Sequence, residues 1–329
     1  MASQTRKPKL NNIENTGFST STQNIEGGRL TNKDGSINVQ KTGIAFWERI
    51  SLYHSLLRMR RWKFLLSVFT FYTVTNILFA IIYLLVGIKH LQGLHADNDL
   101  MSNFQQAFFF SSQTLTTVGY GHISPVGLWA NIVASLESFV GILSFALVTG
   151  LLYGRFTRPR AYLKFSDNLL IAPHKGKTAA MVRVASYKNN HLTDVEAQVT
   201  ISMFMTENGQ HMRKFFTLPL EISRINSLAL SWTMVHPIDE ESPLYGMNHE
   251  DIAESKMEIR YNLKGFDDHF SNIVQQGTSY HYSEFVYGAK FQPVFHRSED
   301  NTTTLLELDK LNAYEAITLP EIEKSAVNA

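Results

Sequence analysis

Two long apolar segments stand out in the pattern of hydrophobic and polar positions along the chain. Residues 64–88 (FLLSVFTFYTVTNILFAIIYLLVGI) contain no charged residue, and residues 128–156 contain only Glu137 and Arg155 as charges. At about 1.5 Å of rise per residue, a helix of either length can cross the roughly 30 Å apolar core of a bilayer. The pattern therefore predicts an outer and an inner transmembrane helix.

Between these spans the sequence predicts a short helix followed by a glycine-rich loop. Residues 101–114 (MSNFQQAFFFSSQT) are largely apolar and follow Asp99, a residue type that caps helices. In the string TVGYG at 117–121, the glycines can adopt left-handed backbone conformations without a Cβ clash. A ladder of backbone carbonyls can replace the hydration shell of potassium. We therefore predict a re-entrant pore helix and a selectivity filter made of Thr117, Val118, Gly119, Tyr120 and Gly121, with potassium bound by the first four.

The chain before the first span is polar and then amphipathic. Residues 1–43 have too few apolar groups to offset the entropy of ordering and lack the apolar core of a signal peptide, so we expect a flexible cytoplasmic tail. Residues 44–61 predict an amphipathic helix in the membrane interface. Its apolar face carries Phe46, Ile50, Tyr53 and Leu57. The pore domain is then expected over residues 62–157.

After residue 157 the period of the apolar positions changes to two. Apolar and polar residues alternate from Val195 to Met203 and again from Met257 to Leu263. Other strand-like runs, separated by turn residues, lie at 161–172, 179–186, 213–222, 228–236 and 279–295. Short strands at this spacing predict an antiparallel β-sandwich over 158–300. Residues 301–329 are expected to form a polar C-terminal tail.

Basic residues gather before the first span and after the second, whereas Lys89 is the only lysine or arginine between them. The positive-inside rule then predicts a multi-pass protein of a plasma or bacterial inner membrane, with both termini in the cytoplasm. The same residues could bind lipid phosphates, and the candidates are Arg60, Arg61, Lys63, Arg158, Arg160 and Lys164. The net charge is +1 and cysteine is absent, so disulfides and thiolate metal sites are excluded and nucleic-acid binding has no support.

The inner helix carries further candidates. Phe145, Thr149 and Tyr153 recur every four residues, so they share a face that could line a cavity and close it at Tyr153. Alternatively, this face could contact lipid or another helix, with Tyr153 as an anchor at the membrane interface. Glu137 lies off that face, which favours a hydrogen-bonded group behind the filter over a pore-lining charge. Gly141 and Gly150 could allow bending, although small residues in membrane helices more often serve as packing contacts. One filter per chain predicts a homotetramer.

Several strings together resemble the inward-rectifier potassium channel family, most closely its prokaryotic branch. They are FFFSSQTLTTVGYGHISP, NIVASLESFVGILSFALVTGLLYGRF, RPRAYLKFSDNLLIAP, WTMVHPIDEESPLYG and SYHYSEFVYGAKFQP. The resemblance implies a membrane protein with a two-transmembrane-helix potassium-channel pore and a cytoplasmic immunoglobulin-like β-sandwich domain. It implies no enzymatic activity and no organic cofactor. It also implies regulation by membrane lipids such as phosphoinositides, and the prokaryotic branch favours inhibition.

Departures from the family pattern concern the pore electrostatics. His122 follows the filter where an acid is common, and four such side chains at the outer mouth would repel cations once protonated. Gln113 and Ile123 stand where many eukaryotic members carry a Glu–Arg pair. Phe145 is apolar where strong rectifiers carry an acid, so we expect weak rectification, with Glu284 as a secondary cytoplasmic-pore site.

Two alternative functions remain open at this point. A constitutive or proton-gated potassium leak channel would share the filter and the apolar cavity face. A membrane-anchored β-domain sensor with a degenerate pore belongs to another class of protein, and the intact filter argues against it.

Overall fold

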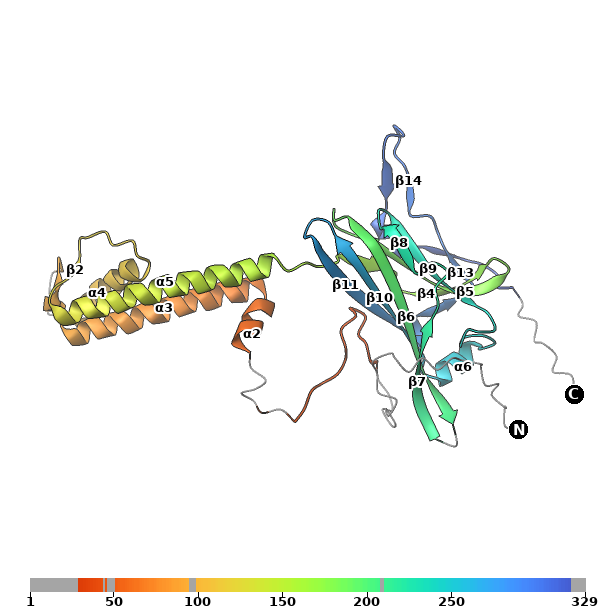
Figure 1. Ribbon diagram of the computed structural model, residues 1–329, viewed down its shortest axis with the longest axis horizontal. Helices are drawn as coiled ribbons and strands as arrows, with labels where there is room; N and C mark the ends of the chain where they lie inside the picture. Colours follow the sequence, from red (N-terminus) through yellow and green to blue (C-terminus); the bar gives the residue numbers. More distant parts are fainter. Residues whose placement is uncertain (1–28, 44, 46–50, 95–98, 208–209, 321–329) are drawn as a thin grey trace, which may run out of the picture. The chain divides into compact units, whose positions relative to one another are not determined.

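The computed structural model describes residues 29–43, 45, 51–94, 99–207 and 210–320, and the chain divides into two compact units (Figure 1). One unit spans Thr42–Arg158 and is helical. The other combines the described part of Met1–Lys41 with Pro159–Ala329 and is rich in β-strands.

The helical unit contains the two predicted spans and the predicted short helix. Its elements are α2 (Leu52–Arg58), α3 (Arg61–Val86), η1 (Ile88–His90), β1 (Leu91–Gln92), α4 (Leu100–Leu115), β2 (Ser124–Pro125) and α5 (Leu128–Phe156). The helices α3 and α5 run side by side and are long and apolar enough to cross a membrane (Figure 1). Asp99 caps α4 as predicted, because its carboxylate accepts from the backbone N–H groups of Met101 and Ser102 at 3.2 and 3.3 Å.

Within the segment 44–61 predicted to form one helix, the structure has α2 over Leu52–Arg58, and Arg61 already begins α3. Ser51 caps α2, since its side chain accepts from the backbone N–H of His54. Residues 44 and 46–50, including Phe46 and Ile50, lie outside the described residues. Of the other two predicted apolar-face residues, Tyr53 is exposed and Leu57 is half-buried.

The β unit is a sandwich of two five-stranded sheets around one core. One sheet has the order β11-β10-β6-β7, with β8 also paired to β6, and the other has the order β12-β4-β5-β3, with β9 also paired to β5. The strands are β3 (Leu163–Phe165), β4 (Leu169–His174), β5 (Lys177–Ser186), β6 (Leu192–Glu207), β7 (Gln210–Leu218), β8 (Arg224–Ser227), β9 (Ser231–Ile238), β10 (Glu258–Asp267), β11 (Asn272–His281) and β12 (Phe285–Tyr287). A short helix, α6 (His249–Glu254), and a 3₁₀ turn, η2 (Tyr282–Glu284), connect them.

The predicted alternation determines which strand faces form this core. Val199 and Ile201 of β6 pack in the same cluster as Val182 and Val184 of β5, so both sheets contribute their apolar faces. One pairing differs from the expected antiparallel arrangement, because β12 pairs with β4 in parallel.

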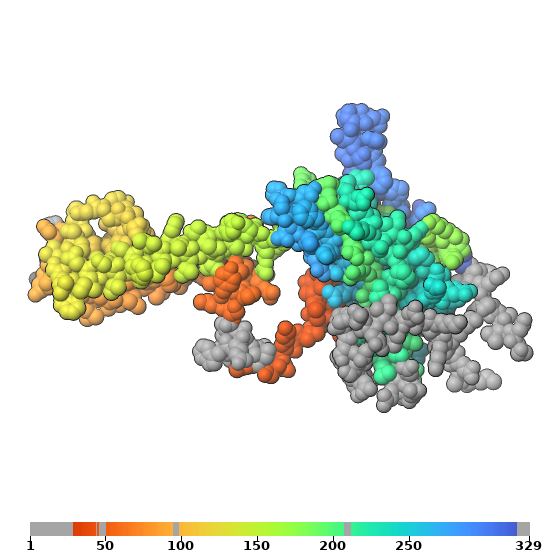
Figure 2. All heavy atoms as spheres, viewed as in Figure 1, coloured from red at the N-terminus to blue at the C-terminus, as the bar shows by residue number. Residues whose placement is uncertain are grey.

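Regular structure continues into the segment expected to be a C-terminal tail. β13 (Ala289–Phe291) pairs with β16 (Tyr314–Ala316), and β14 (Phe295–Arg297) pairs with β15 (Thr304–Leu306) in a hairpin that projects from the β unit (Figure 2). The turn η3 (Leu308–Asn312) buries Leu311 completely. Three-residue strands are too short to produce a recognisable period in the sequence.

Part of the segment expected to be an N-terminal tail also lies against the β-sandwich. Residues 29–38, here called the N-terminal strap, contact β10 and β11. Glu258 accepts from the backbone N–H groups of Leu30 and Thr31, both at 2.9 Å, and Ser279 donates to the carbonyl of Thr31 at 2.6 Å. Thr31 is buried. The strap therefore belongs to the β unit.

Candidate functional site

The predicted filter has an alternating backbone. Thr117, Gly119 and Gly121 have φ values of +59°, +52° and +78°, whereas Val118 and Tyr120 are not among the residues with positive φ. Alternation of this kind turns successive carbonyl groups toward the same side of the strand. Thr117 adopts the left-handed conformation although it is β-branched, which marks it as a strained position. The backbone thus has the form that a carbonyl ladder requires.

The carboxyl end of α4 holds this strand through its own carbonyl groups. The carbonyl of Gln113 accepts from the N–H groups of Val118 and Gly119 at 2.9 and 3.3 Å, and the carbonyl of Thr114 accepts from Thr117 at 3.0 Å. No backbone hydrogen bond between described residues ends on the carbonyl oxygens of 117–120. These oxygens are consequently available to bind a cation, and Val118 and Tyr120 are exposed in the single chain.

The loop after the filter is tied to the end of α3. β1 pairs with β2, with Gln92 opposite Ser124, and Val126 donates to the carbonyl of His90 at 2.8 Å. Gly93 has φ +92°, and a Cβ there would collide with the carbonyl of His122. His122, which directly follows the predicted filter, is exposed.

Where α3, α4 and α5 meet, the three helices share a buried polar cluster, which we call the three-helix network. Glu137 of α5 accepts from the Tyr83 hydroxyl of α3 at 2.6 Å and from the Ser111 hydroxyl of α4. The Ser111 hydroxyl also lies 3.0 Å from Oδ1 of Asn76 on α3. All four side chains are at most 1% exposed. The geometry agrees with a hydrogen-bonded role for Glu137.

Gly141 is a packing position in this structure. A Cβ at Gly141 would collide with the backbone carbonyl of Leu115 at the end of α4, so the two helices approach here more closely than any side chain would allow. By contrast, a Cβ at Gly150 would meet nothing within 4 Å.

The predicted cavity face of α5 is exposed in the single chain. Phe145 and Tyr153 are 76% and 71% exposed, and Thr149 between them is also exposed. These side chains are therefore free to face other copies or an aqueous path.

Arg155 connects the cytoplasmic end of α5 to α2. Its guanidinium donates to the carbonyl of Met59 at 2.6 Å and to that of Leu56, and it lies 4.6 Å from the ring centroid of Phe64. A cation at the carboxyl end of a helix satisfies its free carbonyls and interacts favourably with its dipole. These two hydrogen bonds link α2 to the end of α5 that carries Tyr153.

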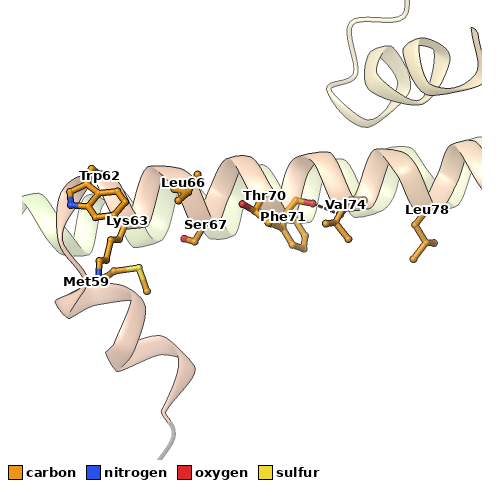
Figure 3. A pocket seen from close by; sticks show the side chains of 10 residues that line it. Met59, Trp62, Lys63, Leu66, Ser67, Thr70, Phe71, Val74 and Leu78 are labelled. Atoms are coloured by element: carbon orange, nitrogen blue, oxygen red, sulfur yellow. Dashed lines mark hydrogen bonds between the residues drawn. The ribbon is translucent and has the colours of Figure 1, made fainter. Parts of the chain in front are cut away.

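The six candidate lipid-binding residues are all exposed. Arg60, Arg61, Lys63 and Arg158 belong to the helical unit, and Arg160 and Lys164 belong to the β unit. An open apolar groove runs along α3 from Trp62 and Lys63 (Figure 3). The groove continues past Leu66, Thr70, Val74 and Leu78.

Glu284 binds the N-terminal strap. Its carboxylate pairs with Arg29 at 2.7 Å and Lys33 at 3.3 Å and accepts from the backbone N–H of His281 at 2.8 Å. Burial alone would raise the pKa of Glu284, but this N–H and the two cations outweigh that effect and hold the pKa below its usual range. The charge expected in the cytoplasmic pore is thus balanced within its own chain.

Asn76, Tyr83 and Ser111 were not among the residues predicted to accompany Glu137. A signal was available, because Asn76 is an amide within an apolar span and Tyr83 lies seven residues later on the same helical face. The partners of Glu284 offered no such signal, since Arg29 and Lys33 lie about 250 residues away in the sequence.

Two family models match the chain. The model described as the inward rectifier potassium channel C-terminal domain matches residues 163–329, and the ion channel model matches residues 64–158. The chain is 34% identical over 281 residues to the inward rectifier potassium channel Kirbac3.1 of Paramagnetospirillum magnetotacticum, which covers 84% of this chain and 92% of that protein.

Vertebrate relatives match over a shorter part of their length. The ATP-sensitive inward rectifier potassium channel 12 of Gallus gallus is 28% identical, and the inward rectifier potassium channel 18 of Homo sapiens is 27% identical. Each alignment covers 73% of this chain and 60% of the vertebrate protein.

Proposed function

The chain belongs to the inward rectifier potassium channel family, and from that premise we propose that four copies form a weakly rectifying, potassium-selective channel regulated by anionic lipids. Its relatives are ion channels and not enzymes, and the family implies potassium as the permeant ion. With two membrane-spanning helices, the protein resides in a membrane.

The observation that carries the proposal is the backbone of the filter. Positive φ at Thr117, Gly119 and Gly121 and the absence of backbone hydrogen bonds to the carbonyls of 117–120 among the described residues support a carbonyl cage for a dehydrated cation. One chain contributes one wall of such a cage, so a closed ring requires several copies, and potassium filters use four.

Two further features support how this channel would be oriented and closed. The basic residues at the ends of α3 and α5 support a cytoplasmic location for both termini. The exposure of Phe145 and Tyr153 supports an apolar cavity with a constriction formed by four Tyr153 side chains.

The proposal is tested by ion uptake into liposomes that contain the purified protein. Uptake of rubidium, a potassium substitute, should greatly exceed uptake of sodium. Equal uptake of the two ions would contradict a selective filter, and no uptake of either would favour a β-domain sensor with a degenerate pore. Uptake that stops on external acidification, and that His122→Asn makes insensitive to pH, would support the proton-gated alternative.

We expect weak rectification, because Phe145 gives the cavity no charge that holds a blocking cation. Phe145→Asp should introduce steep voltage-dependent block by internal magnesium, since four carboxylates in a narrow cavity concentrate cations. Single-channel recording in planar bilayers measures the effect. Glu284→Gln should leave block unchanged, because Arg29 and Lys33 already balance that carboxylate. Steep block in the parent channel that Glu284→Gln removes would contradict this assignment.

We expect lipid control through the basic residues that flank the two spans in the sequence. Phosphoinositide in the liposomes should inhibit rubidium uptake, and Arg158→Gln with Lys164→Gln should weaken the response. Two charges worth about 1 kcal/mol each at an anionic surface correspond to a roughly 30-fold shift in the effective lipid concentration. Lys175→Gln with Lys177→Gln, which removes two exposed charges from the β4–β5 turn, is the matched control. Equal responses in the two double variants would show that Arg158 and Lys164 are only topology signals.

A further inference from the structure

The three-helix network is costly to bury in an apolar segment. Glu137, Ser111, Asn76 and Tyr83 have no more than 1% exposure, within helices that are otherwise apolar on most faces. Polar and ionisable groups at membrane depth are retained when they pair with one another and serve a function. In the described part of the chain, the hydrogen bonds of the Glu137 carboxylate come from the hydroxyl groups of Tyr83 and Ser111, and no cation pairs with it. Hydrogen bonding is therefore the interaction that this site provides.

Two contacts fix α4 against α5, and one of them belongs to the three-helix network. Ser111 bonds to Glu137, and four residues further along each helix, Leu115 meets Gly141. Four residues correspond to about 6 Å along a helix axis, so the contacts lie one turn apart on both helices. Two contacts at matching spacing determine the register of α4 along α5 and restrict its tilt.

α3 holds the other side of α4. Asn76 and Tyr83 lie about two turns apart on one face of α3, and Ala80 between them is fully buried. The amide of Asn76 donates to the carbonyl of Tyr72 at 2.7 Å, which orients its oxygen toward Ser111. Tyr72 in turn contacts the hydroxyl of Ser112. α4 is consequently held to α5 by the hydrogen bond between Ser111 and Glu137 and to α3 by the hydrogen bond between Ser112 and Tyr72.

The position of α4 determines the position of the filter. Gln113, two residues after Ser111, accepts from the N–H groups of Val118 and Gly119. A shift of α4 would therefore move the filter strand directly, and ion discrimination depends on the placement of its carbonyl oxygens.

We propose that Glu137 is a positioning residue for the filter: it holds the carboxyl end of α4 through the Ser111 hydroxyl, is itself fixed to α3 through the Tyr83 hydroxyl, and so sets discrimination of potassium over sodium. This inference rests on the proposed function as a potassium-selective channel. It assigns the role to hydrogen bonding at position 137, so glutamine, whose amide can accept from Tyr83 and donate to Ser111, should replace glutamate.

The test compares sodium and rubidium uptake by the full-length tetramer in liposomes. Tyr83→Phe and Ser111→Ala each remove one oxygen atom, and each should raise the sodium-to-rubidium uptake ratio about fivefold, the effect of one lost hydrogen bond in a buried network. Glu137→Gln should keep the parental ratio, whereas Glu137→Leu should lose discrimination. Ser135→Ala is the matched control, because its hydroxyl is exposed and bonds only to the carbonyl of Asn131 in its own helix.

The outcomes separate the role of the network, the role of the Glu137 charge and the proposed function itself. If Tyr83→Phe and Ser111→Ala keep the ratio of Ser135→Ala, the network does not position the filter. If Glu137→Gln loses discrimination as Glu137→Leu does, the charge and not the hydrogen bonding is required, and the proposal is overturned. A parent protein without discrimination would instead contradict the proposed function. Size-exclusion chromatography identifies variants that fail to assemble. If Glu137→Leu fails to assemble, Tyr83→Phe and Ser111→Ala still test the proposal.

Discussion

Gly119→Ala should reduce rubidium uptake to the level of empty liposomes. Gly119 has φ +52°, and a Cβ in the left-handed region costs about 1–2 kcal/mol in each chain. An alanine there relaxes toward negative φ, which rotates the neighbouring carbonyl groups away from the side on which the ladder forms. Since four chains would contribute to one cage, the carbonyl groups of all four chains would be displaced around each ion. Uptake into liposomes of equal protein content measures the loss.

Gly150→Ala is the matched control for this prediction. Gly150 lies within α5, a Cβ there meets nothing within 4 Å, and alanine is the more favourable residue in a helix. Uptake should therefore stay near the parental level. If Gly119→Ala and Gly150→Ala conduct equally well, the backbone conformation at 119 is not required for conduction.

Glu258→Gln should destabilise the β unit by about 3–5 kcal/mol, the usual effect of leaving a buried charge without its partner. Glu258 pairs with Arg213 at 3.2 Å, and the two side chains are only 3% and 2% exposed. The same carboxylate accepts two N–H groups of the N-terminal strap, so the variant should also loosen residues 29–38. Urea unfolding followed by the fluorescence of the buried Trp232 measures the effect on the core.

Two further variants isolate the contribution of the buried pair. Combining Glu258→Gln with Arg213→Met should restore much of the lost stability, because the unpaired charge is removed as well. Asp194→Asn, which breaks the exposed pair with Arg224, should change stability little, because water screens exposed charges. Equal unfolding midpoints for Glu258→Gln and Asp194→Asn would refute the assignment.

The sequence alone was sufficient where a residue's role depends on its near neighbours. An uncharged apolar run such as 64–88 must be buried, either in a membrane or in a protein core. The alternation from Val195 to Met203 determines the buried face of β6 whatever strands it pairs with. The positive φ of Gly119 and Gly121 follows from residue type within the TVGYG string. The filter and the sandwich could therefore be predicted, and so could the cap at Asp99.

Only the tertiary structure decided the contacts between residues distant in the chain. Local pattern indicated that Glu137 needs a partner, but Tyr83 and Ser111 become its partners only because three helices converge. Glu284 was expected in the cytoplasmic pore by resemblance, and it binds Arg29 because the strap packs beside β11. A side chain's electrostatic role depends on every charge within a few ångströms, whatever the sequence separation. Periodicity reports which face of an element is buried, and the fold determines what that face meets.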